Sequence, residues 1–159
     1  MSRSLPSLET GAPPRMAWLS AFALLGIAAS AASTWVHYRI LNDPTYASFC
    51  DVNATFSCTE AYASRFGSIG GVPVALLGVV FFAFVVGLIA LCSRSSTATA
   101  NLPGYLFAVS TAGLAVVLYL AYASLVILKA VCVLCVGTYI AVIGLFVLSG
   151  AATRYPMTS

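Results

Sequence analysis

The sequence predicts an all-α integral membrane protein, folded as a bundle of four transmembrane helices with a loop on the exoplasmic side. Its 159 residues are 61% hydrophobic and 7% charged, with a mean hydropathy of +1.01, whereas ordinary soluble domains are roughly 25% charged. The net charge of +3 comes from scattered basic residues and does not suggest nucleic-acid binding. A helix needs about 20 apolar residues to span a bilayer, and four windows qualify: residues 16–37, 71–92, 104–127 and 131–151.

The first window supports two interpretations. The stretch "MAWLSAFALLGIAASAAS" can be a cleaved signal peptide, because Arg15 precedes an apolar core and small residues follow at A-x-A-like spacing. It can also be the first transmembrane helix. We favour the helix, because its removal would leave a three-helix remnant with an exposed partner surface.

The segments around the windows differ in character. We predict a disordered cytoplasmic tail at residues 1–15, a transmembrane domain at 16–151 and a second cytoplasmic tail at 152–159. Residues 93–103 ("SRSSTATANLP") are rich in Ser and Thr and predict a loop. Residues 38–70 form the sizeable stretch outside the bilayer, with two cysteines and three of the four acidic residues. Chemistry is therefore expected in residues 38–70.

Four spans place both termini on the same side of the membrane. Basic residues are slightly more numerous on that side than on the other: Arg3, Arg15, Arg94 and Arg154 against Arg39, Arg65 and Lys129. Because basic residues are enriched in cytoplasmic loops, this bias predicts cytoplasmic termini and an exoplasmic segment 38–70.

The five cysteines separate according to this topology. Cys50 and Cys58 lie in the exoplasmic segment, and Cys132 and Cys135 form a C-x-x-C pair at the same edge, where the fourth window begins. Cys92 ends the second window on the cytoplasmic side. Its simplest role is that of a small buried or interfacial hydrophobic residue.

Three interpretations of the four exoplasmic cysteines are open. Cys50 and Cys58 alone can form a structural disulfide, since oxidising compartments favour bridges in loops without a core. A four-cysteine zinc site is disfavoured, because two ligands would lie at the hydrocarbon edge of a helix. A thiol relay would exchange the two pairs through mixed disulfides. The helix dipole stabilises a thiolate at a helix N-terminus, and Lys129, three residues before Cys132, adds a nearby cation.

Four short stretches carry a family resemblance. They are "CDVNATFSC" (residues 50–58), "SRFG" (64–67), "GVPVALLG" (71–78) and "CVLCVGTY" (132–139). Together they resemble the vitamin K epoxide reductase family over about residues 16–150, and "GVPVALLG" is similar to its bacterial members. The resemblance implies a four-helix bundle that encloses a quinone pocket. It also implies an exoplasmic cap with a short half-helix, here beginning near Cys58.

The resemblance implies a role for each matching residue. Cys132 and Cys135 match the pair that passes electrons to the quinone, with Cys135 nearest the ring. Cys50 and Cys58 match the loop pair that accepts electrons from a thioredoxin-fold partner and relays them through a Cys58–Cys132 mixed disulfide. Tyr139, one helical turn after Cys135, matches a tyrosine that hydrogen-bonds a quinone carbonyl. Four further residues match positions that line the pocket: Tyr62, Phe66, Leu120 and Thr138.

The relay requires the half-helix to lie over the bundle. Cys58 must come within disulfide reach of Cys132, with Cα atoms no more than ~7 Å apart. Ala61, Tyr62 and Phe66 can form an apolar face that covers the bundle mouth and the quinone.

One position departs from the vertebrate members of the family. Their asparagine that hydrogen-bonds the naphthoquinone corresponds here to Val74, four residues before Gly78. This puts epoxide reduction in doubt and leaves quinone reduction intact. The single histidine, His37, is interpreted as an interfacial residue near the end of the first helix.

The sequence therefore predicts a quinone-dependent thiol-disulfide oxidoreductase of a bacterial inner membrane that supports disulfide bond formation. It would use no metal, oxidise a DsbA-like thioredoxin-fold protein, and reduce ubiquinone or menaquinone. That partner is expected to be a separate protein, because the chain ends at Ser159 without a fused thioredoxin-like domain. A vertebrate-type vitamin K epoxide reductase is the alternative among enzymes. A disulfide-stiffened tetraspan structural protein is the alternative from another class.

Overall fold

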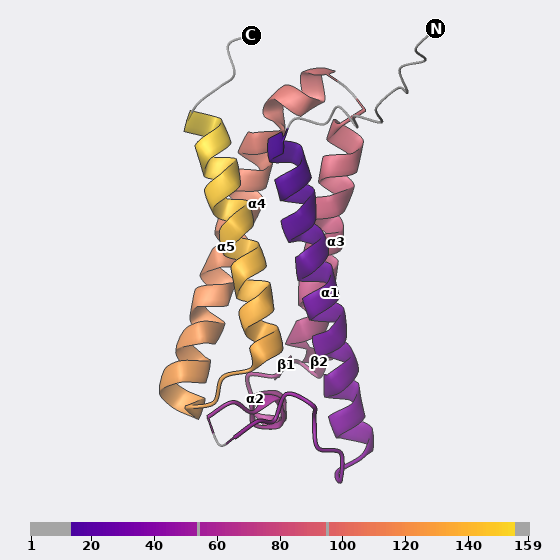
Figure 1. Ribbon diagram of the computed structural model, residues 1–159, viewed down its shortest axis with the longest axis vertical. Helices are drawn as coiled ribbons and strands as arrows, with labels where there is room; N and C mark the ends of the chain where they lie inside the picture. Colours follow the sequence, from indigo (N-terminus) through magenta and orange to yellow (C-terminus); the bar gives the residue numbers. More distant parts are fainter. Residues whose placement is uncertain (1–13, 54, 95, 155–159) are drawn as a thin grey trace, which may run out of the picture.

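The computed structural model describes residues 14–53, 55–94 and 96–154. Four long helices run side by side along the molecule, and a short helix and a hairpin lie at one end (Figure 1). All four are long and apolar enough to cross a membrane, which confirms the predicted four-helix bundle. The long helices are α1 (Pro14–Asn42), α3 (Val74–Cys92), α4 (Ser96–Tyr122) and α5 (Val133–Arg154).

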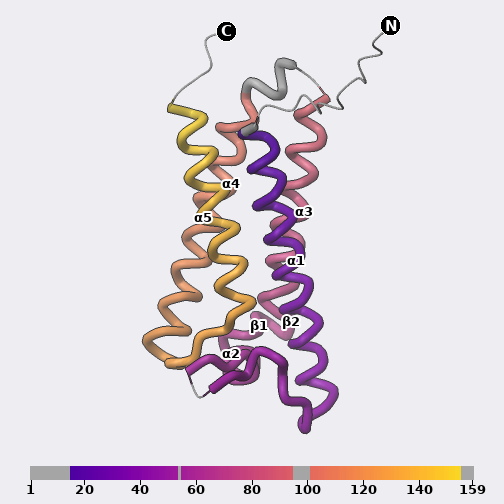
Figure 2. The backbone as a smooth tube through the Cα atoms, in the orientation of Figure 1, coloured from indigo at the N-terminus to yellow at the C-terminus, as the bar shows by residue number. Residues whose placement is uncertain are grey.

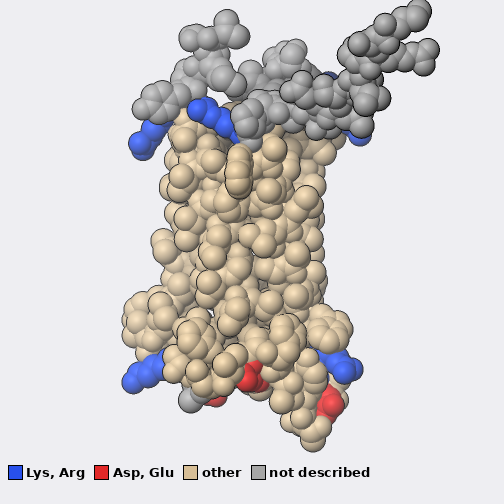
Figure 3. Space-filling view, viewed as in Figure 1, with Lys and Arg blue, Asp and Glu red and all other residues tan. Residues whose placement is uncertain are grey.

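Both ends of the chain lead to the same end of the bundle. The first turn of α1 and the last turn of α5 lie there, and α2 (Cys58–Ala63) lies at the opposite end (Figure 2). Helix α1 contacts α3 and α5, and α5 also contacts α4. On the face drawn in Figure 3, the charged side chains of the described residues gather at the two ends, and the long middle band carries none. A band without charge is what a lipid-facing surface requires.

The first predicted window is a full member of this bundle. Helix α1 has 29 residues and supplies Leu19, Ala23 and Val36 to the buried interior. It begins at Pro14 and α5 ends at Arg154, so short parts of the two predicted tails are helical. The remainder of those tails, with Arg3, lies outside the described residues.

The predicted loop at residues 93–103 is wrong for most of its length. Helix α4 begins at Ser96 and contains Pro103 beyond its first two turns. Leu102 and Leu106 lie one turn apart and are each 1% exposed. A Ser- and Thr-rich start and an internal proline both disfavour a helix. Burial of this leucine pair outweighs them, because packing of an apolar face dominates helix stability in proteins.

A small hairpin replaces the predicted start of the second transmembrane helix. Strands β1 (Ser68–Ile69) and β2 (Val72–Pro73) pair antiparallel. The turn between them uses Gly70 and Gly71 at φ 58° and 84°, a conformation that glycine adopts without steric cost. Helix α3 therefore begins at Val74, directly after the hairpin has turned the chain back into the bundle.

Helix α4 ends in an irregular turn that was not predicted from the sequence. A π-helical segment, η1 (Ala123–Leu128), follows α4 and ends at Lys129, which has the left-handed φ of 53°. The Ala130 N–H then donates to the Ser124 carbonyl at 3.1 Å. Single π-helical turns recur at functional sites, and this one leads the chain to Cys132.

The buried residues form two groups. One fills the bundle and includes Phe82, Val85, Leu145 and Cys92. The other lies under α2, and three of its six buried members are cysteines: Val36, Cys50, Cys58, Ala61, Tyr62 and Cys132. The predicted separation of Cys92 from the other thiols is thus present.

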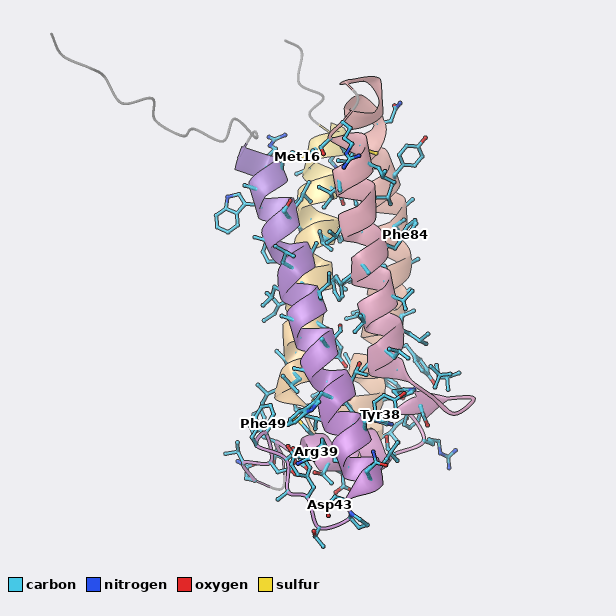
Figure 4. All side chains as sticks on the ribbon, turned by 90° about the vertical axis from the view of Figure 1, so that its right-hand side faces the viewer. Met16, Tyr38, Arg39, Asp43, Phe49 and Phe84 are labelled. Atoms are coloured by element: carbon cyan, nitrogen blue, oxygen red, sulfur yellow. A yellow bond between two sulfur atoms is a disulfide. The ribbon has the colours of Figure 1, made fainter. Side chains whose placement is uncertain are left out.

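Large apolar side chains cover the outside of the bundle. Phe84 projects outward from the middle of α3 (Figure 4) and is 57% exposed. Trp18 and Trp35, near the two ends of α1, are 60% and 55% exposed. Tyr38, Arg39 and Asp43 mark the α2 end of α1 in the same view. Exposed aromatics toward both ends of a spanning helix match the aromatic belts of membrane proteins.

Close packing of α1 on α3 depends on a missing side chain. A Cβ added at Gly26 would lie 2.2–2.4 Å from three ring carbons of Phe82, and Phe82 is 1% exposed. We expect Gly26→Ala to destabilise the protein by about 1–3 kcal/mol, the usual cost of overpacking a core. Thermal unfolding in detergent should show a lower midpoint.

The matched control for this prediction is Gly87→Ala in α3. A Cβ at Gly87 would meet nothing within 4 Å, so this substitution should be neutral or stabilise the helix by roughly 0.5–1 kcal/mol. Equal midpoints for the two variants would show that the Gly26–Phe82 contact does not limit packing.

Candidate active site

The cap, which we define as residues 43–73, is organised around a disulfide. Cys50 and Cys58 are bonded, with Cα atoms 5.8 Å apart, and both are buried. The Ser57 hydroxyl accepts a hydrogen bond from the Glu60 N–H at 3.2 Å and so caps α2. Since α2 begins at Cys58, this cap fixes the direction in which the second sulfur of the loop pair leaves the helix.

A single carboxylate ties the two ends of the disulfide loop together. Asp51 accepts hydrogen bonds from the Ser57 hydroxyl at 3.0 Å and from the Thr59 N–H at 3.1 Å, and it also accepts one from the Thr59 hydroxyl. On the other side the Ser48 N–H donates to it at 3.3 Å. Burial by itself raises the pKa of Asp51, but the hydrogen bonds from Thr59 and Ser57 outweigh burial and lower the pKa to about 2.

The cap is also bonded to the segment that leads into α5. The Val131 N–H donates to the Thr55 carbonyl at 2.7 Å. The Asn53 side chain accepts from the Thr55 and Phe56 N–H groups, each at 2.9 Å, which fixes the turn that carries this carbonyl. The neighbour of Cys132 is therefore held directly against the loop that contains the Cys50–Cys58 disulfide.

Cys132 lies at the N-terminus of α5, under the cap. Its carbonyl accepts the Val136 N–H at 3.0 Å, as the residue before a helix does. Its side chain is 1% exposed, and its Sγ lies 3.0 Å from the Sγ of Cys58. The expected approach of the loop pair to the helix pair is present, although Cys132 and Cys135 are not joined to another cysteine.

Hydrogen bonds around Cys132 favour its thiolate. A hydrogen bond with the Cys135 thiol lowers the pKa of Cys132 most, and the Tyr62 hydroxyl and the N–H groups of Leu134 and Cys135 lower it further, whereas burial acts in the opposite direction. The helix N-terminus thus contributes as predicted. Lys129, the cation predicted to contribute, is not among the main causes of this lowering; its side chain is exposed and it ends the π-helical turn.

Tyr62 links the cap to the helix pair. Its hydroxyl oxygen lies 3.2 Å from the Cys132 Sγ. Burial raises the pKa of Tyr62, and the nearby thiols raise it further, so the phenol keeps its proton. A neutral Cys132 donates to this oxygen, and an ionised Cys132 accepts from it.

A cavity of about 550 Å³ lies inside the bundle beneath the cap. Its volume is within the range of ligand pockets, roughly 300–1,000 Å³, and its wall is mainly apolar with a few hydroxyl groups. Cys135 lines it, so the second thiol of the helix pair faces the space directly. All five residues predicted to bind the quinone also line it: Tyr62, Phe66, Leu120, Thr138 and Tyr139.

Aromatic contacts hold the cap over this cavity. Phe66 meets Tyr119 of α4 edge to face, with ring centroids 6.4 Å apart. Tyr62 meets His37 of α1 in the same way at 5.6 Å. His37 is 3% exposed, so it lies inside the protein against Tyr62 rather than at the lipid surface. Edge-to-face pairs of this kind add to the stability that burial alone supplies.

Some residues of the site belong to no sequence pattern that would have identified them. Ser30 and Ser33 line the cavity, yet a serine in an alanine-rich helix usually only packs. Asp51 organises the loop through contacts with residues up to eight positions away, which spacing alone does not reveal. Val74 lines the cavity with an apolar side chain, in agreement with the departure noted at that position.

The geometry also bears on the rival interpretations of the cysteines. Sulfur atoms joined in a disulfide are not available as thiolate ligands, so the Cys50–Cys58 bond leaves the zinc alternative without support. A purely structural Cys50–Cys58 bridge does not account for the Cys132 sulfur at 3.0 Å. An arrangement for thiol exchange accounts for both observations.

Comparison with known protein families gives one extended match. The family model described as "Vitamin K epoxide reductase family" matches residues 17–150. This range covers more than half of the chain and contains both cysteine pairs, the cap and the wall of the cavity.

We predict that Asp51→Asn loosens the cap over Cys132. The substitution removes the charge that holds the Ser57 and Thr59 groups, and one charge-assisted hydrogen bond corresponds to roughly a tenfold change in an equilibrium. Alkylation of Cys132 by a water-soluble maleimide, followed by peptide mass spectrometry, should become about tenfold faster. The control is Asp43→Asn, which removes the same charge from a carboxylate bonded to Thr45. Equal alkylation rates in both variants would contradict the role of Asp51.

The same carboxylate predicts a pH dependence of the folded state. The pKa of Asp51 is lowered from 3.8 to about 2 by folding, so its stabilisation is complete above about pH 4 and is lost as the pH falls toward 2. The difference in thermal midpoint between the wild type and Asp51→Asn should be constant above pH 4 and should shrink between pH 4 and 2. A difference that stays unchanged down to pH 2 would argue against this assignment.

Proposed function

The chain belongs to the vitamin K epoxide reductase family, whose members are quinone-reducing thiol oxidoreductases, and we propose that it passes electrons from a thioredoxin-fold protein through its two cysteine pairs to a membrane quinone. The observation that carries this proposal is the 3.0 Å approach of the Cys58 and Cys132 sulfur atoms. It joins a disulfide in the cap to a thiol pair whose other member, Cys135, faces the cavity.

Electrons enter through the loop pair. A thiolate of the partner attacks the Cys50 sulfur, and Cys58 leaves as a thiolate. Cys58 then attacks Cys132 in an oxidised Cys132–Cys135 pair, and Cys135 leaves as a thiolate. The second thiol of the partner then attacks the partner's first sulfur, which is bonded to Cys50. The partner's disulfide forms, and Cys50 leaves as a thiolate. Cys50 then attacks Cys58, which restores the loop disulfide and releases Cys132.

The balance of these exchanges is one partner dithiol oxidised and one helix pair reduced. The products are a bonded Cys50–Cys58 pair and an unbonded Cys132 and Cys135, which is the pairing of the structure. The features that lower the pKa of Cys132 support its release as a thiolate, because a thiol of lower pKa leaves faster.

The cavity residues fit a quinone. A membrane quinone, when bound, accepts two electrons and two protons from the helix pair as the Cys132–Cys135 disulfide re-forms. The Tyr139 side chain lines the cavity one turn after Cys135 and can donate to a carbonyl. The Thr138 hydroxyl instead donates to the Cys135 carbonyl at 2.7 Å, so its proton is engaged. The cap excludes water from the thiol that faces the ring.

We assign the partner by the surface beside Cys50. Phe49, labelled in Figure 4, and Val52 flank this cysteine and are 66% and 73% exposed. Thioredoxin-fold proteins of the DsbA-like type are dithiol donors of suitable chemistry, and their docking would cover these apolar side chains. The excess of basic residues that the sequence predicts on the side of the termini, with Arg3 counted, supports an exoplasmic cap, in a bacterial inner membrane with cytoplasmic termini.

Within the family, quinone reduction is favoured over epoxide reduction. By the resemblance Val74 takes the position of the vertebrate asparagine, and its apolar side chain lines the cavity. Ubiquinone and menaquinone both suit the mainly apolar wall.

Two substitutions separate the roles of the cysteine pairs. Cys135→Ala should abolish quinone reduction with every donor, including dithiothreitol, because it removes the thiol that faces the cavity. Cys50→Ala should abolish turnover with a thioredoxin-fold donor and keep part of the rate with dithiothreitol, which can reduce the helix pair directly. Both rates are measured from the absorbance of the quinone. Turnover of Cys135→Ala, or equal losses with both donors in Cys50→Ala, would refute the assigned order.

The exchange itself can be trapped. Cys50→Ala with Cys135→Ala removes the thiol that would resolve each end of the mixed disulfide, so oxidation should yield a stable Cys58–Cys132 bond. Non-reducing peptide mass spectrometry detects this cross-link. The matched control, Cys50→Ala with Cys132→Ala, should give far less cross-linked peptide. Two free thiols in the first variant after oxidation would show that the relay does not operate.

A further inference from the structure

Two buried hydroxyl groups of α1 have no hydrogen-bond partner among the described residues. They belong to Ser30 and Ser33, which are 1% and 3% exposed. A buried hydroxyl without a partner costs roughly 1–3 kcal/mol, and most such groups in folded proteins are satisfied. Ser30 and Ser33 therefore need an explanation that packing alone does not give.

Both serines line the cavity assigned to the quinone. They are three residues apart, so they lie on the same face of α1. Ser30 fits against α3 at Gly78, where an added Cβ would come within 2.7 Å of its oxygen. The Ser33 hydroxyl lies close enough to the Tyr62 phenol to act toward lowering the pKa of Tyr62, and Tyr62 in turn contacts Cys132. The pair thus adds two polar groups to a wall that is otherwise mainly apolar.

The other buried serines of the bundle show a different pattern. Ser110 is 1% exposed, and its hydroxyl donates to the Phe107 carbonyl at 3.2 Å and lies 3.3 Å from the Ser149 hydroxyl. The Ser149 hydroxyl lies 2.7 Å from the Leu145 carbonyl. Ser110 and Ser149, which do not line the cavity, are thus satisfied within the protein, whereas Ser30 has no partner among the described residues and Ser33 has the Tyr62 phenol as its polar neighbour.

A quinone presents two carbonyl oxygens, at opposite ends of the ring, that accept hydrogen bonds and donate none. On the α5 side of the cavity, Tyr139 can donate to one carbonyl. Val74 of α3 has no donor, and the proton of Thr138, on α5, is engaged by a backbone carbonyl. Serine hydroxyls can rotate between staggered positions and can each supply a donor from α1.

We propose that Ser30 and Ser33 form the second polar end of the quinone site and hydrogen-bond the carbonyl that Tyr139 does not reach. This inference rests on the proposed function. It assigns to α1 the hydrogen bond to the second carbonyl, which in vertebrate members comes from the asparagine of the second transmembrane helix. A substrate with two carbonyl groups would be preferred over one with a single carbonyl.

Kinetic and infrared measurements test the contact with the ligand. Ser30→Ala and Ser33→Ala should each raise the KM for menadione, with dithiothreitol as donor, by about fivefold, the effect of one neutral hydrogen bond. The double variant should show the larger increase. With carbonyl-labelled menadione bound to the protein, the double variant should shift one carbonyl stretching band to higher frequency and leave the other in place.

The stability of the ligand-free protein supplies an independent measurement. Ser30→Ala and Ser33→Ala remove hydroxyl groups that lack a hydrogen-bond partner in the described part of the chain, so their thermal midpoints should be unchanged or higher. Ser110→Ala removes a hydroxyl that is hydrogen-bonded within the protein, so it should unfold at a lower temperature. The increase of the midpoint on addition of menadione should be smaller in the Ser30 and Ser33 variants than in Ser110→Ala and the wild type.

The outcomes separate this inference from the proposed function. If the wild type neither reduces menadione nor gains stability from it, the proposed function fails. If the wild type does both, and the double variant keeps its KM and both carbonyl bands, the serines do not contact the quinone and the inference is overturned. Midpoints that fall in Ser30→Ala and Ser33→Ala as far as in Ser110→Ala, with an unchanged KM, would likewise show a purely structural role.

Discussion

The approach of two sulfur atoms that are not bonded to each other is the constraint on which the rest of this structure depends. The Cys58 Sγ lies 3.0 Å from the Cys132 Sγ, although the two residues are 74 positions apart in the chain. Cys58 belongs to the cap, and Cys132 directly precedes α5. Neither position is free. Cys58 is fixed by the Ser57 cap of α2 and by Asp51, and Cys132 is fixed by the first hydrogen bond of α5. The hairpin and the π-helical turn bring these elements together at one end of the bundle.

The membrane imposes a second constraint, which explains how few polar groups the bundle contains. In lipid, an unsatisfied polar group has no water to compensate it, so a buried hydroxyl is expected to be satisfied within the protein or placed where a ligand can satisfy it. The satisfied pair Ser110 and Ser149 illustrates the first case. Ser30 and Ser33 illustrate the second, since both line the cavity that Cys135 and Tyr139 also line.

Composition and motif spacing were enough to predict four helices and the shared edge of the two cysteine pairs, whereas the residues that line the cavity were predicted from the family resemblance. They succeeded because lipid requires long apolar runs and because C-x-x-C at a helix start is a strong local pattern. They failed where distant packing decides the outcome. Burial of Leu102 and Leu106 extends α4 through a segment that looks like a loop. The π-helical turn and the Asp51 network arise from contacts between separate segments, for which no periodicity exists in the sequence.

Among the described residues, half of the buried group beneath the cap consists of cysteines. This group consists of Val36, Ala61 and Tyr62 together with three cysteines that take part in the proposed exchange, so rearrangement of the disulfides rearranges the packing of the cap itself. Polar contacts that do not involve sulfur, those of Asp51 and the Val131–Thr55 bond, are independent of the redox state. They can keep the cap in register while its sulfur atoms change partners. Since exchange proceeds only when the attacking and leaving sulfurs stay close, this division between a redox-active interior and a redox-independent frame is what allows one loop to serve both an external partner and a buried helix pair.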